Sequence, residues 1–406
     1  MTKIPFFFSI IFILTYSSAN PIDPTEFNLH LFNESTQARC LDGSQYGIYQ
    51  APGFDSGLKK VIISFWGGGL CEGRTQEAFF SDCVTRSQTN LGSSNPWDRT
   101  SYYTSGFLAG VESESPNFFN WNRFDLPYCD GSFHQRHITN PVLFNGTELY
   151  FRGVQNVRTA LNYITTVVDF KKIELLVVAG GSTGGYATFT WSQHISNMIK
   201  EINPETKVIA IPDSGFFVDY YNYMTKDRDY YYQNKLFYEI VNKEIPPLTA
   251  ECLKEHPGAE DLCLFPEYFV KFVNVPMLLT QSGYDSSNLF ETVGLQCVVN
   301  NTLSGCSKED QGHAHVFKDY QKNLIKKEIE RHKSFSAWLP ACVTHCFDDK
   351  INSVNWEVPE KSGMTVNEVV KAFLENPEER KVYIDELYWP GNTNCANVME
   401  GHLDIF

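Results

Sequence analysis

The chain has 406 residues, of which 42% are hydrophobic, and a formal net charge of −15 at pH 7. This charge argues against nucleic acid and anionic membrane surfaces as partners, because both are bound by clustered lysine and arginine. The length suits one large α/β domain, which we expect over residues 20–406.

The N-terminus has the pattern of a secretory signal. Lys3 precedes an apolar run over residues 4–14, and the small residues Ser17-Ser18-Ala19 follow. This order predicts a signal peptide over residues 1–19, cleaved after Ala19. An uncleaved membrane anchor is the alternative, although the run is short for a bilayer span. We therefore expect a secreted protein, outside the cell or in the secretory lumen, without stable membrane insertion.

The cysteine content agrees with this compartment. Eleven cysteines in a secreted chain favour disulfides, and no Cys-x-x-Cys pair indicates a zinc site. Asparagines in Asn-x-Ser/Thr contexts are candidate glycan acceptors, namely Asn33, Asn145 and Asn300.

The first informative segment is a strand-like run over residues 61–66 that leads into Gly67-Gly68-Gly69-Leu70. Glycines after a strand expose backbone N–H groups, which can bind the oxyanion that develops during acyl transfer. Gly69 and Leu70 are the candidate donors. The alternative is that the glycines form only a flexible turn.

A predicted strand over residues 175–179 runs directly into Gly180-Gly181-Ser182-Thr183-Gly184, after a helix over residues 153–164 and before a second helix. The Gly-x-Ser-x-Gly spacing between a strand and a helix is typical of a nucleophile elbow. Ser182 is therefore the candidate nucleophile, and the N–H of Thr183 is a third oxyanion donor. Without these flanks, a plain glycine-rich loop would be the better interpretation.

Two further strands are predicted, over residues 208–212 and 275–281. Asp285 follows the second and could hold a histidine in the correct tautomer. Taken alone, a turn-former or a helix N-cap is the more common role of such an aspartate. Asp213 and Asp219, after the first strand, are interpreted as turn or cap residues rather than as substrate contacts.

The general base must be one of ten histidines. In hydrolases with this elbow the order is serine, acid, histidine, which leaves five candidates: His313, His315, His332, His345 and His402. His345 is favoured because Cys342 and Cys346 flank it and could fix its loop. The charged run over residues 322–333 predicts a helix with a solvated face.

Ordered motifs along most of the chain resemble the pectin acetylesterases and the related Wnt deacylase Notum. They include Cys40-Leu41-Asp42-Gly43-Ser44, residues 64–71, Leu91-Gly92-Ser93-Ser94, Phe119-Asn120-Trp121-Asn122-Arg123, residues 128–133, Phe151-Arg152-Gly153, the elbow, residues 213–217, Tyr284-Asp285-Ser286 and Cys342-Val343-Thr344-His345-Cys346. The chain departs from the family pattern in three places: Leu70 stands in place of a tryptophan, Thr183 in place of a small alanine, and a C-terminal cysteine is missing around Trp389-Pro390-Gly391.

The resemblance implies an α/β-hydrolase-like fold, with a mostly parallel sheet flanked by helices and loops held by disulfides. It implies Ser182 as nucleophile, Asp285 as acid and His345 as base. With proximity, it favours the cysteine pairs 71–83, 252–263, 297–306 and 40–129, and a bond from Cys395 to Cys342 or Cys346. One cysteine is left over.

The function expected from these features is a secreted serine esterase that removes O-acetyl groups from pectin or a related polysaccharide, without a metal or a cofactor. The net charge fits poorly with a polyanionic pectin. A Notum-like carboxylesterase for a longer acyl group on a protein or lipid is one alternative, and an inactive carbohydrate-binding protein is another. A serine protease has no support beyond the shared triad chemistry. The oligomeric state stays open.

Overall fold

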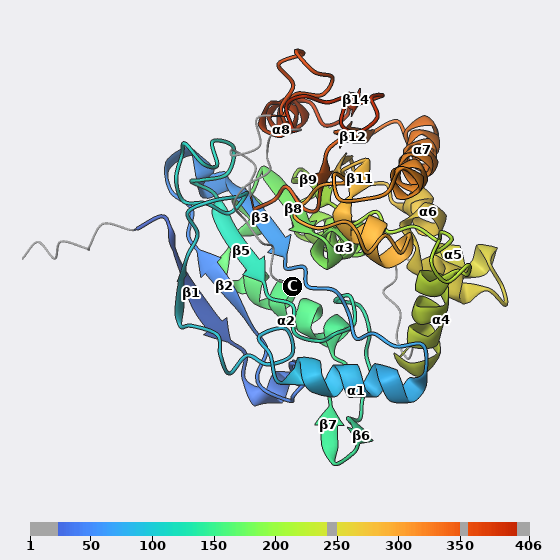
Figure 1. Cartoon of the computed structure of the whole chain (residues 1–406). Coiled ribbons are helices and arrows are strands. Elements are labelled where there is room, and N and C mark those ends of the chain that lie inside the picture. The colour runs from blue at the N-terminus through green and yellow to red at the C-terminus, as the bar shows by residue number, and fades with distance from the viewer. Residues whose placement is uncertain (1–22, 242–249, 350–355, 396–406) are drawn as a thin grey trace, which may run out of the picture.

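The computed structural model describes residues 23–241, 250–349 and 356–395. The predicted signal peptide and His402 lie outside these ranges. The core of the fold is a ten-stranded sheet with the strand order β14-β12-β10-β9-β8-β3-β5-β2-β1-β4. Figure 1 shows this sheet running through the molecule, with helices on both sides. The prediction of an α/β fold is confirmed.

Most of the sheet is parallel, and one end is antiparallel. The strands from β14 to β5 pair in parallel, whereas β2, β1 and β4 are added antiparallel. The bounds of the strands are β1 Glu26–Leu31, β2 Gly47–Ala51, β3 Lys60–Phe65, β4 Thr100–Tyr102, β5 Asn122–Leu126, β8 Leu175–Gly181, β9 Lys207–Asp213, β10 Met277–Thr280, β12 Phe335–Leu339 and β14 Val382–Ile384.

Burial on both faces explains the apolar character of the central strands. Along β3, Val61 and Ile63 belong to one hydrophobic cluster, and Ile62 belongs to the cluster on the other face. A strand of this kind is a nearly continuous apolar run, because neither of its faces meets water.

Helices cover both faces. Helix α3 packs on β3, β8 and β9, whereas α8 contributes Val366 and Phe373 to the second cluster. The bounds of the helices are α1 Gln76–Ser87, α2 Gly153–Val167, α3 Thr183–Ile202, α4 Asp229–Val241, α5 Ala250–Glu255, α6 Pro266–Phe269, α7 Lys308–Arg331 and α8 Val366–Glu375, and α4 adjoins residues outside the described ranges.

Helix α7 is longer than the predicted charged run. It begins at Lys308, where Ser307 and Asp310 form a capping box, well before residues 322–333. Within that run Lys327, Glu330 and Arg331 are exposed, as predicted for a solvated face, whereas Glu328 is buried.

Two short strand pairs lie outside the main sheet. β6 (Val142–Phe144) and β7 (Thr147–Leu149) form a hairpin, and β11 (Tyr284–Asp285) pairs in parallel with β13 (Val343–Thr344). The second pair matters for the site, because Asp285 stands opposite Thr344, the residue before His345.

Five disulfides hold the loops. They join Cys40 to Cys129, Cys71 to Cys83, Cys252 to Cys263, Cys297 to Cys306, and Cys342 to Cys395. The predicted pairs are confirmed, Cys342 is the partner of Cys395, and Cys346 is the cysteine left over.

Two surface features bear on the compartment. The three candidate glycan acceptors Asn33, Asn145 and Asn300 are all exposed. Within the described ranges, no helix is both long enough and apolar enough to cross a membrane.

Candidate active site

Ser182 occupies a sharp turn between β8 and α3. Its backbone has φ 56° and ψ −125°, a conformation that residues other than glycine rarely adopt. The turn is tight because the neighbouring glycines lie against β3: a Cβ on Gly180 would lie 2.6 Å, and one on Gly184 1.9 Å, from the carbonyl oxygen of Phe65. The glycines predicted to permit an elbow are therefore required by packing, and Ser182 lies at the carboxyl edge of the sheet.

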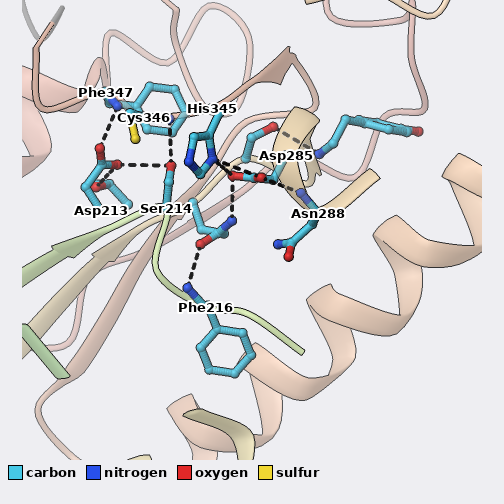
Figure 2. A network of polar contacts seen from close by, with 12 residues as sticks. Asp213, Ser214, Phe216, Asp285, Asn288, His345, Cys346 and Phe347 are labelled. Atoms are coloured by element: carbon cyan, nitrogen blue, oxygen red, sulfur yellow. Dashed lines mark hydrogen bonds and ion pairs between the residues drawn. The ribbon is translucent and has the colours of Figure 1, made fainter. Parts of the chain in front are cut away.

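Asp285 and His345 are in direct contact. The Nδ1 atom of His345 lies 2.9 Å from Oδ2 and 3.0 Å from Oδ1 of Asp285, and both residues are buried. Figure 2 shows the imidazole facing this carboxylate. An aspartate at Nδ1 keeps the proton on that nitrogen, which leaves Nε2 able to accept one. The structure thus brings together the predicted acid and base.

The Asp285 carboxylate is itself held on both oxygens. The side-chain amide of Gln281 donates to Oδ2 over 3.0 Å, and the backbone N–H of Asn288 donates to Oδ1 over 3.0 Å. The contact with Asn288 is of the kind expected for a residue at the start of a helical turn. Asp285 therefore acts both as the partner of His345 and as a cap for a helical turn. Gln281 supports it and was not predicted from the sequence.

The loop that carries His345 is anchored by the end of β9. Asp213 accepts from the backbone N–H groups of Phe347, over 2.6 Å, and Asp348, over 3.0 Å. The hydroxyl of Ser214 accepts from the N–H of Cys346 over 3.0 Å. Figure 2 shows these contacts on the side of His345 opposite Asp285. Asp213 is fully buried, so its role is neither a surface turn nor a substrate contact.

Asp348 brings a second carboxyl group close to the elbow. A Cβ on Gly181 would lie 2.5 Å from its carboxylate oxygens, so Asp348 lies directly over the residue before Ser182. Burial, together with the nearby Asp213 and Asp349, raises the pKa of Asp348 well above its usual range, and burial raises the pKa of Asp213 to about 6. Burial thus disfavours the charged form of Asp348 beside the elbow.

The three predicted oxyanion donors meet beside Ser182. Gly69, Leu70 and Thr183 line the same cavity as Ser182 and His345. Among the described residues, no acceptor takes a hydrogen bond from the backbone N–H groups of these three. Free N–H groups beside a nucleophile are what an oxyanion requires.

Side chains fix this glycine loop in place. The Thr183 hydroxyl donates to the carbonyl oxygen of Gly69 over 3.0 Å, and the Arg86 guanidinium donates to the carbonyl oxygens of Gly68 and Leu70. Arg86 also lies over the Tyr128 ring, 5.2 Å from its centre. Thr183, a departure from the family pattern, therefore connects the two sides of the proposed oxyanion site.

The cavity around Ser182, here called the catalytic cavity, has a volume of about 950 Å³. Its wall combines apolar side chains with acidic ones. The apolar part includes Leu70, Leu91, Phe133, Phe217, Tyr230, Phe290 and Val298. Glu72 and Glu291 lie on the same wall, and burial together with Glu291 and Asp82 raises the pKa of Glu72 to about 7.

The other described histidines do not reach this cavity. Nδ1 of His315 lies 2.8 Å from the Tyr284 hydroxyl, His313 packs on the Tyr223 ring, and His332 is the C-cap of α7. Of the four candidates within the described ranges, only His345 lines the catalytic cavity.

One group of potential metal ligands adjoins the histidine loop. Ligand atoms of Asp213, Cys346 and Asp348 lie within 4.8 Å of one another. Both oxygens of Asp213 already accept hydrogen bonds, Oδ1 from the Thr280 hydroxyl and Oδ2 from the backbone. These contacts make Asp213 a loop anchor, and we assign no metal to the group.

Comparison with known proteins also points to an esterase. The family model described as pectinacetylesterase matches residues 22–396. Pectin acetylesterase 5 of Arabidopsis thaliana is 25% identical over 395 residues, covering 93% of this chain and 86% of that protein. The palmitoleoyl-protein carboxylesterase NOTUM of Schmidtea mediterranea is 27% identical over 389 residues, covering 92% of this chain and 68% of that protein.

The fold is also found among solved structures. The Wnt deacylase Notum from Drosophila aligns with a TM-score of 0.75 at 19% identity, covering 91% of this chain and 99% of that chain. At this identity the likeness concerns the fold, and it supports the predicted α/β-hydrolase-like architecture.

Proposed function

Because the chain belongs to the pectinacetylesterase family and is a carboxylic ester hydrolase, we propose that it is a secreted serine esterase acting through an acyl-enzyme on Ser182. The proposed substrate is an O-acetylated polysaccharide such as pectin. The observation that carries this proposal is the contact of 2.9 Å between His345 Nδ1 and Asp285, on the wall of the cavity that also holds Ser182.

In the proposed first half-reaction, the Ser182 hydroxyl oxygen attacks the ester carbonyl carbon while Nε2 of His345 takes its proton. The oxyanion that forms accepts hydrogen bonds from the N–H groups of Thr183, Gly69 and Leu70. The carbon–oxygen bond to the alcohol then breaks, and His345 returns the proton to the leaving oxygen. Acetyl-Ser182 and the free alcohol are the products.

Water completes the cycle. His345 takes a proton from a water molecule that attacks the acetyl carbonyl, the second tetrahedral intermediate collapses, and the proton passes to the Ser182 oxygen. Acetate leaves and the serine is restored. Asp285 accepts the hydrogen bond from Nδ1 and supports the imidazolium in both halves. These steps use only protein groups and water.

A second candidate function is favoured by the size of the catalytic cavity. About 950 Å³ lined partly by Phe133, Phe217 and Val298 is more than an acetyl group fills. Such a wall could bind the acyl chain of a longer ester, as the names of the Notum relatives suggest for those proteins.

A series of nitrophenyl esters from acetyl to palmitoyl distinguishes these functions. The purified full chain is compared with its Ser182→Ala variant. Acetyl hydrolysis that is lost in the variant supports the deacetylase, and a preference for long chains supports the second candidate. Equal rates for the two proteins on every ester would contradict the esterase mechanism and favour an inactive carbohydrate-binding protein.

A further inference from the structure

A second cavity adjoins the catalytic one and has no part in the steps above. It has a volume of about 420 Å³ and lies on the other side of Gly67, Asp348 and Asp349, which line both cavities. Gly67 itself packs on Ser182, since a Cβ on Gly67 would lie 2.8 Å from the serine Cβ. A group bound in the second cavity would therefore lie close to the reacting ester.

The base of this second cavity is the buried carboxylate of Asp125, which is only 1% exposed. Its Oδ2 accepts from the indole N–H of Trp66 and the hydroxyl of Tyr103. Its Oδ1 accepts no hydrogen bond from the described part of the chain. This oxygen is therefore available to accept a hydrogen bond from a ligand that enters the cavity.

The rest of the wall has the character of a sugar-binding surface. The rings of Trp66, Tyr102 and Tyr103 line it together with the hydroxyl-bearing residues Ser64, Thr104 and Ser105. Aromatic rings pack on the apolar faces of a pyranose, and hydroxyl and carboxyl groups bond to its edges. Burial raises the pKa of Asp125 to about 7, so near neutrality this carboxyl can both donate to and accept from a sugar hydroxyl.

Charge limits which sugar would bind. Apart from the tyrosines, the ionisable residues that line the second cavity are all acidic: Asp125, Asp348 and Asp349. Arg86 is the one lysine or arginine on the described wall of the neighbouring catalytic cavity, and its guanidinium is engaged with the carbonyls of Gly68 and Leu70. A uronate carboxylate would lose its hydration here without a free cation to balance its charge, in a site where burial already disfavours the charged forms of Asp125 and Asp348.

We propose that the second cavity, built on Trp66, Tyr103 and Asp125, binds an uncharged sugar residue on the alcohol side of the ester and discriminates against a uronate there. This inference rests on the proposed esterase function and narrows its substrate from acetylated polysaccharides in general to those with neutral sugar residues, so that polyanionic pectin would be a poorer substrate. It also fits the net charge of −15, because a neutral glycan is not repelled by a negatively charged protein.

A matched pair of substrates tests the charge discrimination. A mono-O-acetylated methyl galactopyranoside and the corresponding methyl galactopyranosiduronate differ only in CH₂OH against carboxylate at C6. We expect the wild-type chain to deacetylate the neutral galactoside with a kcat/KM at least about tenfold higher, the effect of one unfavourable charge contact. Equal values, or faster cleavage of the uronate, would overturn the inference.

The residues are tested with Tyr103→Phe, which removes the hydroxyl that holds Asp125. We expect the ratio of kcat/KM for the galactoside to that for 4-nitrophenyl acetate to fall about tenfold, since a hydrogen bond to a charged group is involved. The matched control is Tyr150→Phe, which removes a hydroxyl bonded to Glu148 on the β6–β7 hairpin, 2.9 Å away. An unchanged ratio in Tyr103→Phe would contradict the assignment.

A binding measurement separates this inference from the proposed function. Calorimetry with the Ser182→Ala chain is expected to detect the neutral acetylated galactoside and to show weaker binding of the uronate. Equal or tighter binding of the uronate, or no binding of the galactoside, would overturn the inference. If the wild-type chain fails to cleave 4-nitrophenyl acetate while this selectivity holds, only the proposed function is contradicted.

Discussion

At the residue scale, the state of one imidazole governs the proposed chemistry. Asp285 contacts Nδ1 of His345 with both oxygens and is itself held by Gln281 and the N–H of Asn288. The sequence allowed Asp285 to be predicted from its place after a strand, and His345 from chain order, its flanking cysteines and the family resemblance. Gln281 could not be predicted, because nothing in a strand-end glutamine indicates that its amide will turn toward an aspartate four residues later.

Replacing Asp285 by asparagine keeps the shape of the site but offers an amide N–H or a neutral oxygen to the imidazole. We expect kcat to fall by roughly 10³–10⁴-fold, because the imidazolium loses its counter-charge and the tautomer is no longer fixed. Steady-state kinetics on 4-nitrophenyl acetate measure this, with the melting temperature as a control for folding. A loss of less than about tenfold would contradict the role of Asp285.

Thr183 is expected to act through the position of the oxyanion loop. Thr183→Ala keeps the backbone N–H but removes the hydroxyl that donates to Gly69, whereas Thr183→Ser retains that hydroxyl. We expect kcat to fall about fivefold in the alanine variant, which corresponds to about 1 kcal/mol for one hydrogen bond, and to be largely restored in the serine variant. Equal kinetics in the two variants would show that the hydroxyl is not needed.

At the element scale, the histidine loop depends on segments far away in the chain. It is held by Asp213 at the end of β9, by the pairing of β11 with β13, and by the disulfide from Cys342 to Cys395. The sequence predicted β9 and placed Asp213 at its end. It gave no sign that the carboxylate turns inward, because an aspartate after a strand is equally common in exposed turns.

Removing the disulfide with Cys342→Ser and Cys395→Ser should affect catalysis more than a comparable loss elsewhere. The matched control is Cys252→Ser with Cys263→Ser. Loop-closure entropy predicts a destabilisation of about 4 kcal/mol for the first pair and about 3 kcal/mol for the control, so the stability effects are similar. We expect kcat to fall at least about tenfold further in the first pair. Equal activities would contradict the role of this bond in positioning His345.

At the scale of the whole molecule, the parallel half of the sheet was predictable and the antiparallel half was not. The runs at residues 61–66 and 175–179 are apolar except for Ser64, as expected for strands covered on both faces. By contrast, β1, β2 and β4 contain polar residues such as Asn28 and Gln50, and their pairing depends on long-range contacts. The second cavity was equally hidden, since Trp66, Tyr103 and Asp125 meet only in the folded chain.

Buried acids should make stability decrease with pH above neutrality. Burial raises the pKa of Asp125 to about 7 and that of Glu267 to about 8. The folded state therefore binds protons that the unfolded state has released, and this stabilisation is lost as pH rises through these values. Buried histidines with a lowered pKa, such as His134, make stability rise with pH instead, but only below about pH 6.5, where the unfolded state binds the proton.

We accordingly expect the melting temperature to fall between pH 6.5 and pH 8.5, and Glu267→Gln to reduce the slope. Scanning calorimetry at constant ionic strength measures both effects. A melting temperature that rises across this interval would contradict the proposed burial of ionisable carboxyl groups.

The measurement that tests the central claim most directly is covalent labelling by a fluorophosphonate, which reacts with an activated serine. The full chain is treated, digested and mapped by mass spectrometry, beside Ser182→Ala and His345→Ala variants. The account predicts a single adduct on Ser182, absent from the first variant and strongly slowed in the second. An adduct on another serine, or ester hydrolysis that persists in Ser182→Ala, would contradict the proposal that Ser182 is the nucleophile.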